Sequence, residues 1–150
     1  MDSSETFVWS DAFLLGYPQM DETHREFVET VNAMLTVPDE AFALALDAFA
    51  EHAERHFGEE AEWMHASDFP ALQCHIDEHD AVMKSVREVQ DLVASDPRNG
   101  VKTGRRLARE LVRWFPGHAD YLDSALSHWM TKKTHGGAPV VLRRRAAARD

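Results

Sequence analysis

The chain has 150 residues, of which 44% are hydrophobic and 28% are charged, a balance typical of one globular domain with a sizeable core. Its 26 acidic residues outnumber 16 basic ones, and the net charge of −10 argues against nucleic acid as a partner, because phosphate contacts need clustered Lys and Arg. No apolar run reaches the roughly 18 residues of a membrane span, and no signal-peptide pattern opens the chain. With only one cysteine, Cys74, these features predict a soluble, cytoplasmic protein.

Four segments have helical periodicity, and clusters of Pro, Gly, Asp and Ser separate them. The first helix is expected over residues 21–36, with Asp21 as its cap, and the second over residues 38–66, with Pro38 in its first turn. The third is expected from about residue 70 to 94, and the fourth over residues 102–131 after a loop. Short connections between four helices favour an all-α, up-down-up-down antiparallel bundle, preceded by an N-terminal arm.

The last nineteen residues differ in charge from the rest of the chain. Residues 132–150 contain six basic side chains and one acidic one, Asp150. We expect a bundle domain over residues 1–131 and a basic, flexible tail over residues 132–150. The tail could dock on an anionic membrane or on another protein, although a solvated chain end is the simpler interpretation. The sequence leaves the oligomeric state open.

Polar residues interrupt the apolar stripe of every predicted helix. Five are histidines and two are carboxylates: His24, His56, Glu60, His75, His79, His118 and Asp123. A single histidine on an apolar stripe is usually a hydrogen-bonded core residue, but five on four converging helices indicate a shared role. Burial of an unpaired carboxylate costs on the order of several kcal/mol of desolvation free energy. A bound cation compensates this cost. The stripes therefore predict a metal site inside the bundle.

The spacing of these residues supports one centre. His56 and Glu60 are i,i+4 neighbours, as are His75 and His79, so each pair shares a helix face. His118 and Asp123 are i,i+5 and diverge on a regular helix. The upstream Pro116 removes a backbone hydrogen bond, so we expect a kink or bulge that brings the two side chains together, unless the proline splits the helix outright.

The number and type of ligands favour iron over other metals. Seven ligands are too many for one zinc ion, which takes four, and calcium or magnesium would not recruit five imidazoles. Mixed imidazole and carboxylate ligands suit two iron ions bridged by the carboxylates. With a bridging oxygen, twelve coordination positions then leave one open for a small diatomic ligand. Ferritin-like di-iron oxidases use two Glu-x-x-His motifs, whereas this chain has that spacing once, at Glu62 and His65.

The chain resembles the hemerythrins, specifically the single-domain bacterial members. The matching motifs span residues 9–130 in the correct order. They are Met20-Asp21-x2-His24-x2-Phe27, His56-Phe57-x2-Glu60 with Met64, Phe69-Pro70-x4-His75-x3-His79 and Trp114-x3-His118-x4-Asp123. Phe69 stands where the family commonly has tyrosine. The motif selects Glu60 as the ligand, and its neighbour Glu59 is the other carboxylate to check for that role.

The resemblance implies a division of roles among the seven residues. His75, His79 and His118 would bind one iron, His24 and His56 the other, and Glu60 and Asp123 would bridge them. It implies a non-haem di-iron centre with an oxo or hydroxo bridge, and dioxygen held reversibly as hydroperoxide at the iron with two histidines. Phe27, Phe57, Trp63 and Trp114 are candidates to line a dry pocket. His52, one turn before His56, is expected to support the site from outside.

Two other functions remain open beside an oxygen carrier, store or sensor. One is a di-iron enzyme, such as an oxidase, a peroxidase or a nitric oxide reductase. The other is an iron-storage protein. We expect an oxygen-binding protein rather than an enzyme, because an imidazole-rich site is less able to stabilise highly oxidised iron.

Overall fold

The computed structural model describes residues 7–134, and these form a bundle of helices in which no strand occurs. The long helices are α1 (Pro18–Thr36), α2 (Phe42–Ala66), α3 (Leu72–Ser95), α4 (Pro97–His118) and α5 (Ser124–Thr134). Short 3-10 turns occupy Asp11–Phe13 and Asp39–Ala41, and a π-helix occupies Ala119–Asp123. The prediction of an all-α four-helix bundle is confirmed. None of these helices is both long and apolar enough to cross a membrane.

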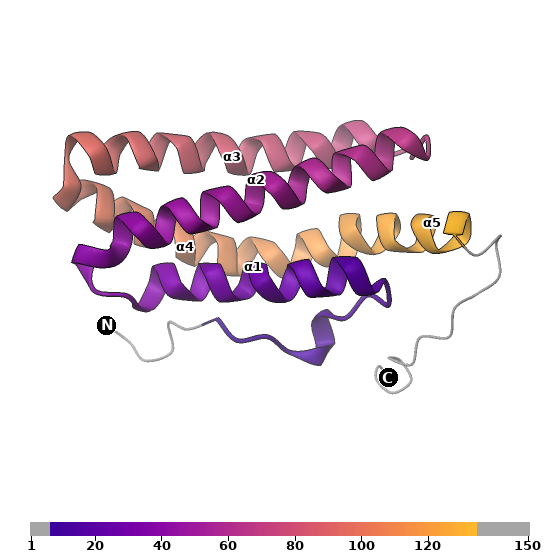
Figure 1. Ribbon diagram of the computed structural model, residues 1–150, viewed down its shortest axis with the longest axis horizontal. Coiled ribbons are helices and arrows are strands. Elements are labelled where there is room, and N and C mark those ends of the chain that lie inside the picture. Colours follow the sequence, from indigo (N-terminus) through magenta and orange to yellow (C-terminus); the bar gives the residue numbers. More distant parts are fainter. Residues whose placement is uncertain (1–6, 135–150) are drawn as a thin grey trace.

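The fourth element of the bundle is one continuous helical rod made of α4, the π-helix and α5. The residues at both joints, Ala119 and Ser124, keep right-handed helical dihedral angles. In Figure 1 the chain reverses its direction after α1, after α2 and after α3. Each helix packs against the next one along the chain, and α1 also packs against α4, which closes the ring of four.

Three helix starts differ from the sequence-based expectation. The second helix, α2, begins at Phe42 rather than at residue 38, because Pro38 precedes the short 3-10 turn Asp39–Ala41. The fourth helix begins at Pro97 rather than at residue 102, because Pro97 suits the first helical position and Asp96 accepts a hydrogen bond from the Asn99 backbone N–H. The first begins at Pro18, and Asp21 does not cap it. The Asp21 carboxylate accepts backbone hydrogen bonds from Leu15 and Gly16 instead, at 2.7 and 3.1 Å, which ties the N-terminal arm to α1.

The described part of the N-terminal arm packs its aromatic rings on the bundle. Phe7 and Phe13 meet the buried ring of Phe115 edge-on, with ring centroids 5.9 and 5.2 Å apart. The backbone N–H of Phe7 also donates a hydrogen bond to the side chain of Asn32 in α1. The arm therefore covers the face of the bundle where α1 and α4 meet.

The buried face of α4 includes three small residues, Gly100, Gly104 and Ala108. Leu107 and Trp114 are only partly buried, while the buried positions are Gly100, Gly104, Ala108, Leu111, Phe115 and His118. Small residues let neighbouring helices approach closely: a Cβ at Gly100 would meet the backbone of Val93, and one at Gly104 would meet the ring of Phe42. The side chains of α2 and α3 thus fill space that α4 leaves free.

The core consists of two hydrophobic clusters at different levels of the bundle. The larger one includes Phe27, Phe49, Val86 and Phe115. The smaller one contains Met20, Met64, Phe69 and Leu126. Along each helix the predicted metal-binding residues lie in sequence between members of the two clusters. A polar layer therefore crosses the bundle between two apolar ones.

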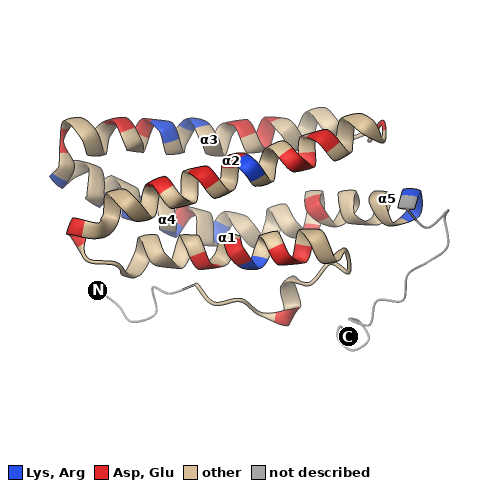
Figure 2. Ribbon diagram, in the orientation of Figure 1, with Lys and Arg blue, Asp and Glu red and all other residues tan. Residues whose placement is uncertain are grey.

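Apart from Asp21, Glu60 and Asp123, the charged side chains of the described residues are exposed or partly exposed. Figure 2 shows acidic residues along α1, α2 and α3, and two basic ones, Lys132 and Lys133, in the last turn of α5. Apart from residues 132–134, the predicted basic tail lies outside the described residues, as do residues 1–6.

Candidate metal centre

The seven predicted side chains converge inside the bundle. They form two groups whose ligand atoms lie within 4.8 Å of one another, namely His75, His79, His118 and Asp123, and His24, His56 and Glu60. Every one of the seven is buried, with at most 5% of its surface exposed. Each of the four helical rods contributes, so the site exists only when the whole bundle is assembled.

Local helix geometry explains how each pair reaches the centre. The i,i+4 pairs in α2 and α3 share a face, as predicted. His118 and Asp123 reach it because the five residues Ala119–Asp123 form a π-helix, whose wider turn brings i,i+5 residues onto one face. His118 Nε2 thereby lies 3.2 Å from Asp123 Oδ1. The expected distortion after Pro116 is confirmed, and the helix continues through the proline rather than ending there.

Each carboxylate turns one oxygen to each histidine group. Glu60 Oε2 lies 3.3 Å from His56 Nε2, while its Oε1 lies 3.2 Å from His75 Nε2. The two oxygens of Asp123 divide in the same way. Its Oδ2 lies 3.0 Å from His24 Nε2, and its Oδ1 lies 2.9 Å from His75 Nε2. Both carboxylates therefore stand between the two groups in a bridging arrangement.

The pKa values of the two buried carboxyl groups shift in opposite directions. Burial and the neighbouring Asp123 raise the pKa of Glu60 to about 7. Burial would also raise the pKa of Asp123, but its close contacts with His118 and His24 hold it well below its ordinary value. A buried pair of like charges favours one proton on the pair, and here Glu60 is the member that takes it.

The histidines of the centre differ in the direction of their pKa shifts, according to their contacts with the two carboxylates. Burial acts to lower the pKa of His75, but its contacts with Asp123 and Glu60 raise it to about 9, and Asp123 likewise raises that of His24. Burial and neighbouring imidazoles lower the pKa of His56 to about 3 and that of His79 to about 2. In the absence of a cation, the site thus compensates its buried carboxylates with protons on particular imidazoles.

Several polar atoms at the centre lack a hydrogen-bond partner within the described part of the chain. Both oxygens of Glu60, Oδ2 of Asp123 and both ring nitrogens of His24 are buried and unsatisfied. His24 Nε2 is only 3.0 Å from Asp123 Oδ2, yet the two are not aligned as a hydrogen bond. His79 Nε2 and His118 Nε2 face each other at 3.1 Å. Because unsatisfied buried polar atoms are rare and costly, this donor set fits metal ions that accept their lone pairs.

Aromatic rings surround the two groups. Phe57 stacks on the His79 ring with centroids 3.8 Å apart, and Trp114 stacks on the His118 ring at 4.2 Å. Phe27 stacks on Phe115, whose ring meets His24 edge-on at 5.2 Å. Trp63, the fourth predicted pocket residue, packs instead with the smaller hydrophobic cluster. Three of the four predicted aromatic residues thus lie around the centre.

Sequence reasoning missed two residues beside the centre. Phe115 covers His24, whereas the sequence predicts its neighbour Trp114, and not Phe115, as a candidate pocket residue. Glu78 accepts hydrogen bonds from His118 and Trp114. It lies between Asp77 and His79 on a charged stretch, where a glutamate ordinarily faces solvent. A carboxylate adjacent to a candidate metal-binding histidine is the signal that could have found it.

The remaining histidines and nearby polar residues lie outside the two groups. His52 Nε2 lies 3.1 Å from Glu26 Oε1, and its ring stacks on His56 at 5.9 Å, a contact consistent with support from outside. Glu59 is exposed, as are His65 and His128, while His135 lies outside the described residues. Cys74 is also exposed.

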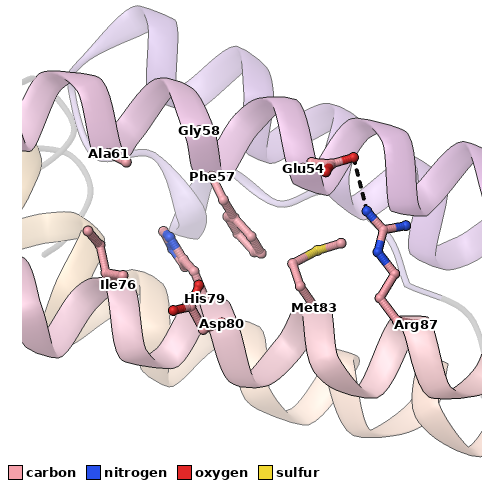
Figure 3. Close-up of a pocket in the computed structure, with 9 residues that line it drawn as sticks. All are labelled: Glu54, Phe57, Gly58, Ala61, Ile76, His79, Asp80, Met83 and Arg87. Carbon is pink, nitrogen blue, oxygen red and sulfur yellow. Dashed lines mark ion pairs between the residues drawn. The ribbon is translucent and has the colours of Figure 1, made fainter.

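A groove of about 360 Å³ leads from the surface towards the three-histidine group. It runs between α2 and α3, and Figure 3 shows Phe57 and His79 side by side in it. At one end Arg87 forms an ion pair with Glu54, with a nitrogen to oxygen distance of 3.0 Å. Gly58 lines the groove, and the space beside it is open, because a Cβ at that position would meet nothing within 4 Å.

Comparisons with known proteins agree with this site. A family model described as the hemerythrin HHE cation binding domain matches residues 15–127. A Bacteriohemerythrin of Ralstonia nicotianae is 41% identical over 125 residues, which cover 83% of this chain and 89% of that protein. A Bacteriohemerythrin of Clostridium acetobutylicum is 31% identical over 53% of this chain and 68% of its own, and one of Aquifex aeolicus is 29% identical over 70% and 82%. No solved structure matches the chain.

Proposed function

The chain belongs to the hemerythrin family, and from this premise we propose that it binds dioxygen reversibly at a non-haem centre of two iron ions. His75, His79 and His118 would hold one iron, His24 and His56 would hold the other, and Glu60 and Asp123 would bridge them. When bound, the two iron ions supply the pair of electrons that reversible capture of dioxygen requires. An oxo or hydroxo bridge is part of this proposal.

One observation carries the assignment of two metal ions rather than one. The two oxygens of Glu60 lie 3.3 Å from His56 and 3.2 Å from His75, on opposite sides of the carboxylate. Asp123 repeats the pattern with His24 and His75. A single ion would need these oxygens to point to one place, whereas a pair of ions needs this division.

We assign dioxygen binding to the side of His24 and His56, because it offers one imidazole fewer and so leaves a coordination position open. The rings of Phe115 and Phe27 stack beside His24 and are almost fully buried. Apolar side chains at this position exclude water, which favours retention of bound oxygen over its loss to side reactions. The protein would then act as a carrier, a store or a sensor.

The test is a cycle of reduction and oxygenation. The protein should contain about two irons per chain, which its mixed imidazole and carboxylate ligands suit. After anaerobic reduction it should form a coloured adduct with oxygen. Vacuum should remove the colour and oxygen should restore it. Rapid irreversible oxidation with turnover of an added reductant would instead support a di-iron enzyme. Iron content far above two per chain would support storage.

We extend the proposal to the organisation and place of the chain. Residues 1–131 would act as one metal-binding domain and residues 132–150 as a basic tail. The family match ends at residue 127, which supports this division. The single cysteine favours the reducing cytoplasm. The excess of 26 acidic over 16 basic residues disfavours nucleic acid as a partner.

A further inference from the structure

The Glu78 side chain connects the buried His118 ring with the protein surface. Its Oε1 atom lies 2.9 Å from His118 Nδ1 and 3.2 Å from Trp114 Nε1. The Glu78 side chain is 44% exposed, whereas that of His118 is 3% exposed. An indole N–H can only donate, and a carboxylate oxygen can only accept. His118 Nδ1 must therefore carry the hydrogen, which leaves the lone pair of Nε2 pointing to the centre.

Trp114 restrains the same imidazole in a second direction. Its ring stacks on that of His118, with centroids 4.2 Å apart and planes inclined by 24°. The hydrogen bond from Nδ1 fixes rotation of the imidazole in its plane, and the indole fixes the position of its face. Because Glu78 also accepts a hydrogen bond from the Trp114 N–H, the same carboxylate fixes the positions of both rings.

Three other histidines of the centre lack such support within the described part of the chain. The Nδ1 atoms of His24, His56 and His75 are buried without a hydrogen-bond partner. The carboxylate contact to an outward-facing nitrogen therefore distinguishes His118 from these three. His118 belongs to the three-histidine group, and His24 and His56 form the side to which we assign oxygen.

We propose that Glu78 is a positioning residue that fixes the Nδ1–H tautomer of His118 and stabilises the ferric state of the iron on the three-histidine side. This inference rests on the proposed function. A carboxylate that accepts the outward N–H of a ligating histidine makes the imidazole more basic and more electron-donating. A more electron-rich ligand favours the higher oxidation state. Its placement on one side makes the two irons electronically unequal.

Three variants separate the charge from the hydrogen bond. Glu78→Gln keeps an acceptor oxygen of similar shape but removes the charge. Glu78→Ala removes both. Asp77→Asn is the matched control, because Asp77 is the exposed neighbour whose carboxylate accepts a hydrogen bond from Gln73 rather than from the centre.

The first measurement uses the metal-free protein and nitrogen-15 NMR of the histidine rings at mildly alkaline pH. Wild type, Glu78→Gln and Asp77→Asn should show His118 with hydrogen on Nδ1. Glu78→Ala should lose or mix this tautomer while its circular dichroism stays helical. An unchanged His118 tautomer in Glu78→Ala would overturn the positioning role.

The second measurement is a redox titration of the iron-loaded protein. Removal of the charge should shift the reduction equilibrium about tenfold towards the ferrous state, which corresponds to a rise of about 59 mV for a one-electron couple. Glu78→Gln and Glu78→Ala should both show the rise, and Asp77→Asn should not. Equal potentials in Glu78→Gln and wild type would overturn the electronic role.

The two proposals fail in different ways. Wild-type protein without about two irons, or without a reversible oxygen adduct, would contradict the proposed function. The tautomer measurement needs no metal, so it would still decide whether Glu78 positions His118. Conversely, reversible oxygen binding by wild type with an unchanged potential in Glu78→Gln would reject the inference alone.

Discussion

His118 Nε2 and Asp123 Oδ1 lie 3.2 Å apart, although a regular α-helix would point these i,i+5 side chains in different directions. The π-helix Ala119–Asp123 places one extra residue in this turn. π-Helical turns are rare and recur at functional sites, and this one brings together two residues of the candidate metal centre.

Deletion of Tyr121 should convert the π-helix into an α-helix without losing metal. The Tyr121 side chain is 80% exposed, so its removal leaves the core intact. His118 and Asp123 would then become i,i+4 neighbours, the spacing that already serves His56 and Glu60. Iron analysis should find about two irons per chain, as in wild type.

Insertion of one alanine after Tyr121 is the matched control. His118 and Asp123 would then be i,i+6 residues and point apart. Because His118 is a proposed ligand and Asp123 a proposed bridge, at least about one iron per chain should be lost. Loss of iron in the deletion variant, with helicity retained, would show that the π-helix serves more than the approach of these residues.

Replacement of either carboxylate should abolish binding of the metal pair. Glu60→Ala and Asp123→Ala each remove a side chain whose oxygens face both histidine groups, so both irons are affected. Removal of a metal-binding or directly supporting group typically lowers metal affinity by about 10- to 100-fold or more. Iron analysis after dialysis is the measurement.

His52→Ala controls for general damage to α2. His52 is buried and stacks on His56, but its Nε2 lies beside Glu26 rather than in the centre. This variant should keep about two irons per chain, the number expected of the intact ligand set. Two irons and reversible oxygen binding in either carboxylate variant would contradict the ligand assignment.

Metal binding should release protons in a pH-dependent manner. In the metal-free fold the pKa of His75 is raised to about 9 and that of Glu60 to about 7, so near pH 7 the first is protonated and the second about half so. Both must lose their protons to bind a cation. Apparent affinity should therefore fall as the pH falls, and these groups should release fewer protons as the pH rises from about 6 to about 9.

Calorimetry in buffers of different ionisation enthalpy counts these protons. The count should decrease with pH by about one to two over this interval, since two groups with these pKa values lose their protons before the metal arrives. A count that stays constant would show that Glu60 and His75 are not protonated in the metal-free protein.

Two glycines in helices should respond oppositely to the same substitution. Gly104→Ala drives a Cβ into the ring of Phe42, and overpacking of this kind costs about 1–3 kcal/mol. Gly58→Ala meets nothing within 4 Å and should stabilise α2 by about 0.5–1 kcal/mol, because alanine loses less backbone entropy in a helix. Urea unfolding of the metal-free protein measures both, and equal effects would contradict the close packing of α4.

Regular spacing made much of this molecule predictable from its sequence. The i,i+4 pairs in α2 and α3 predicted shared faces, and Pro116 before an i,i+5 pair predicted the distortion that the π-helix provides. The convergence of seven polar side chains followed from their places on four apolar stripes. In these cases the local pattern and the three-dimensional requirement coincide.

Other features depend on contacts between distant residues, and no local pattern contains them. Asp21 has the residue type of a cap, but it accepts hydrogen bonds from the arm that folds back on α1. The buried face of α4 is set by the bulk of Phe42 and by the backbone at Val93, which made Gly100 and Gly104 core positions. Glu78 reaches His118 only because α3 and α4 pack side by side.

The polar layer between the two hydrophobic clusters has a consequence for the motions of the bundle. The end around Met20, Met64, Phe69 and Leu126 holds a small apolar core of its own, separated from the larger one by buried groups with unsatisfied hydrogen bonds. Without a cation this end can open as a separate unit, since local stability follows local apolar contact. A bound pair of metal ions would link the two ends, so amide exchange and proteolysis at this end should slow when iron is bound.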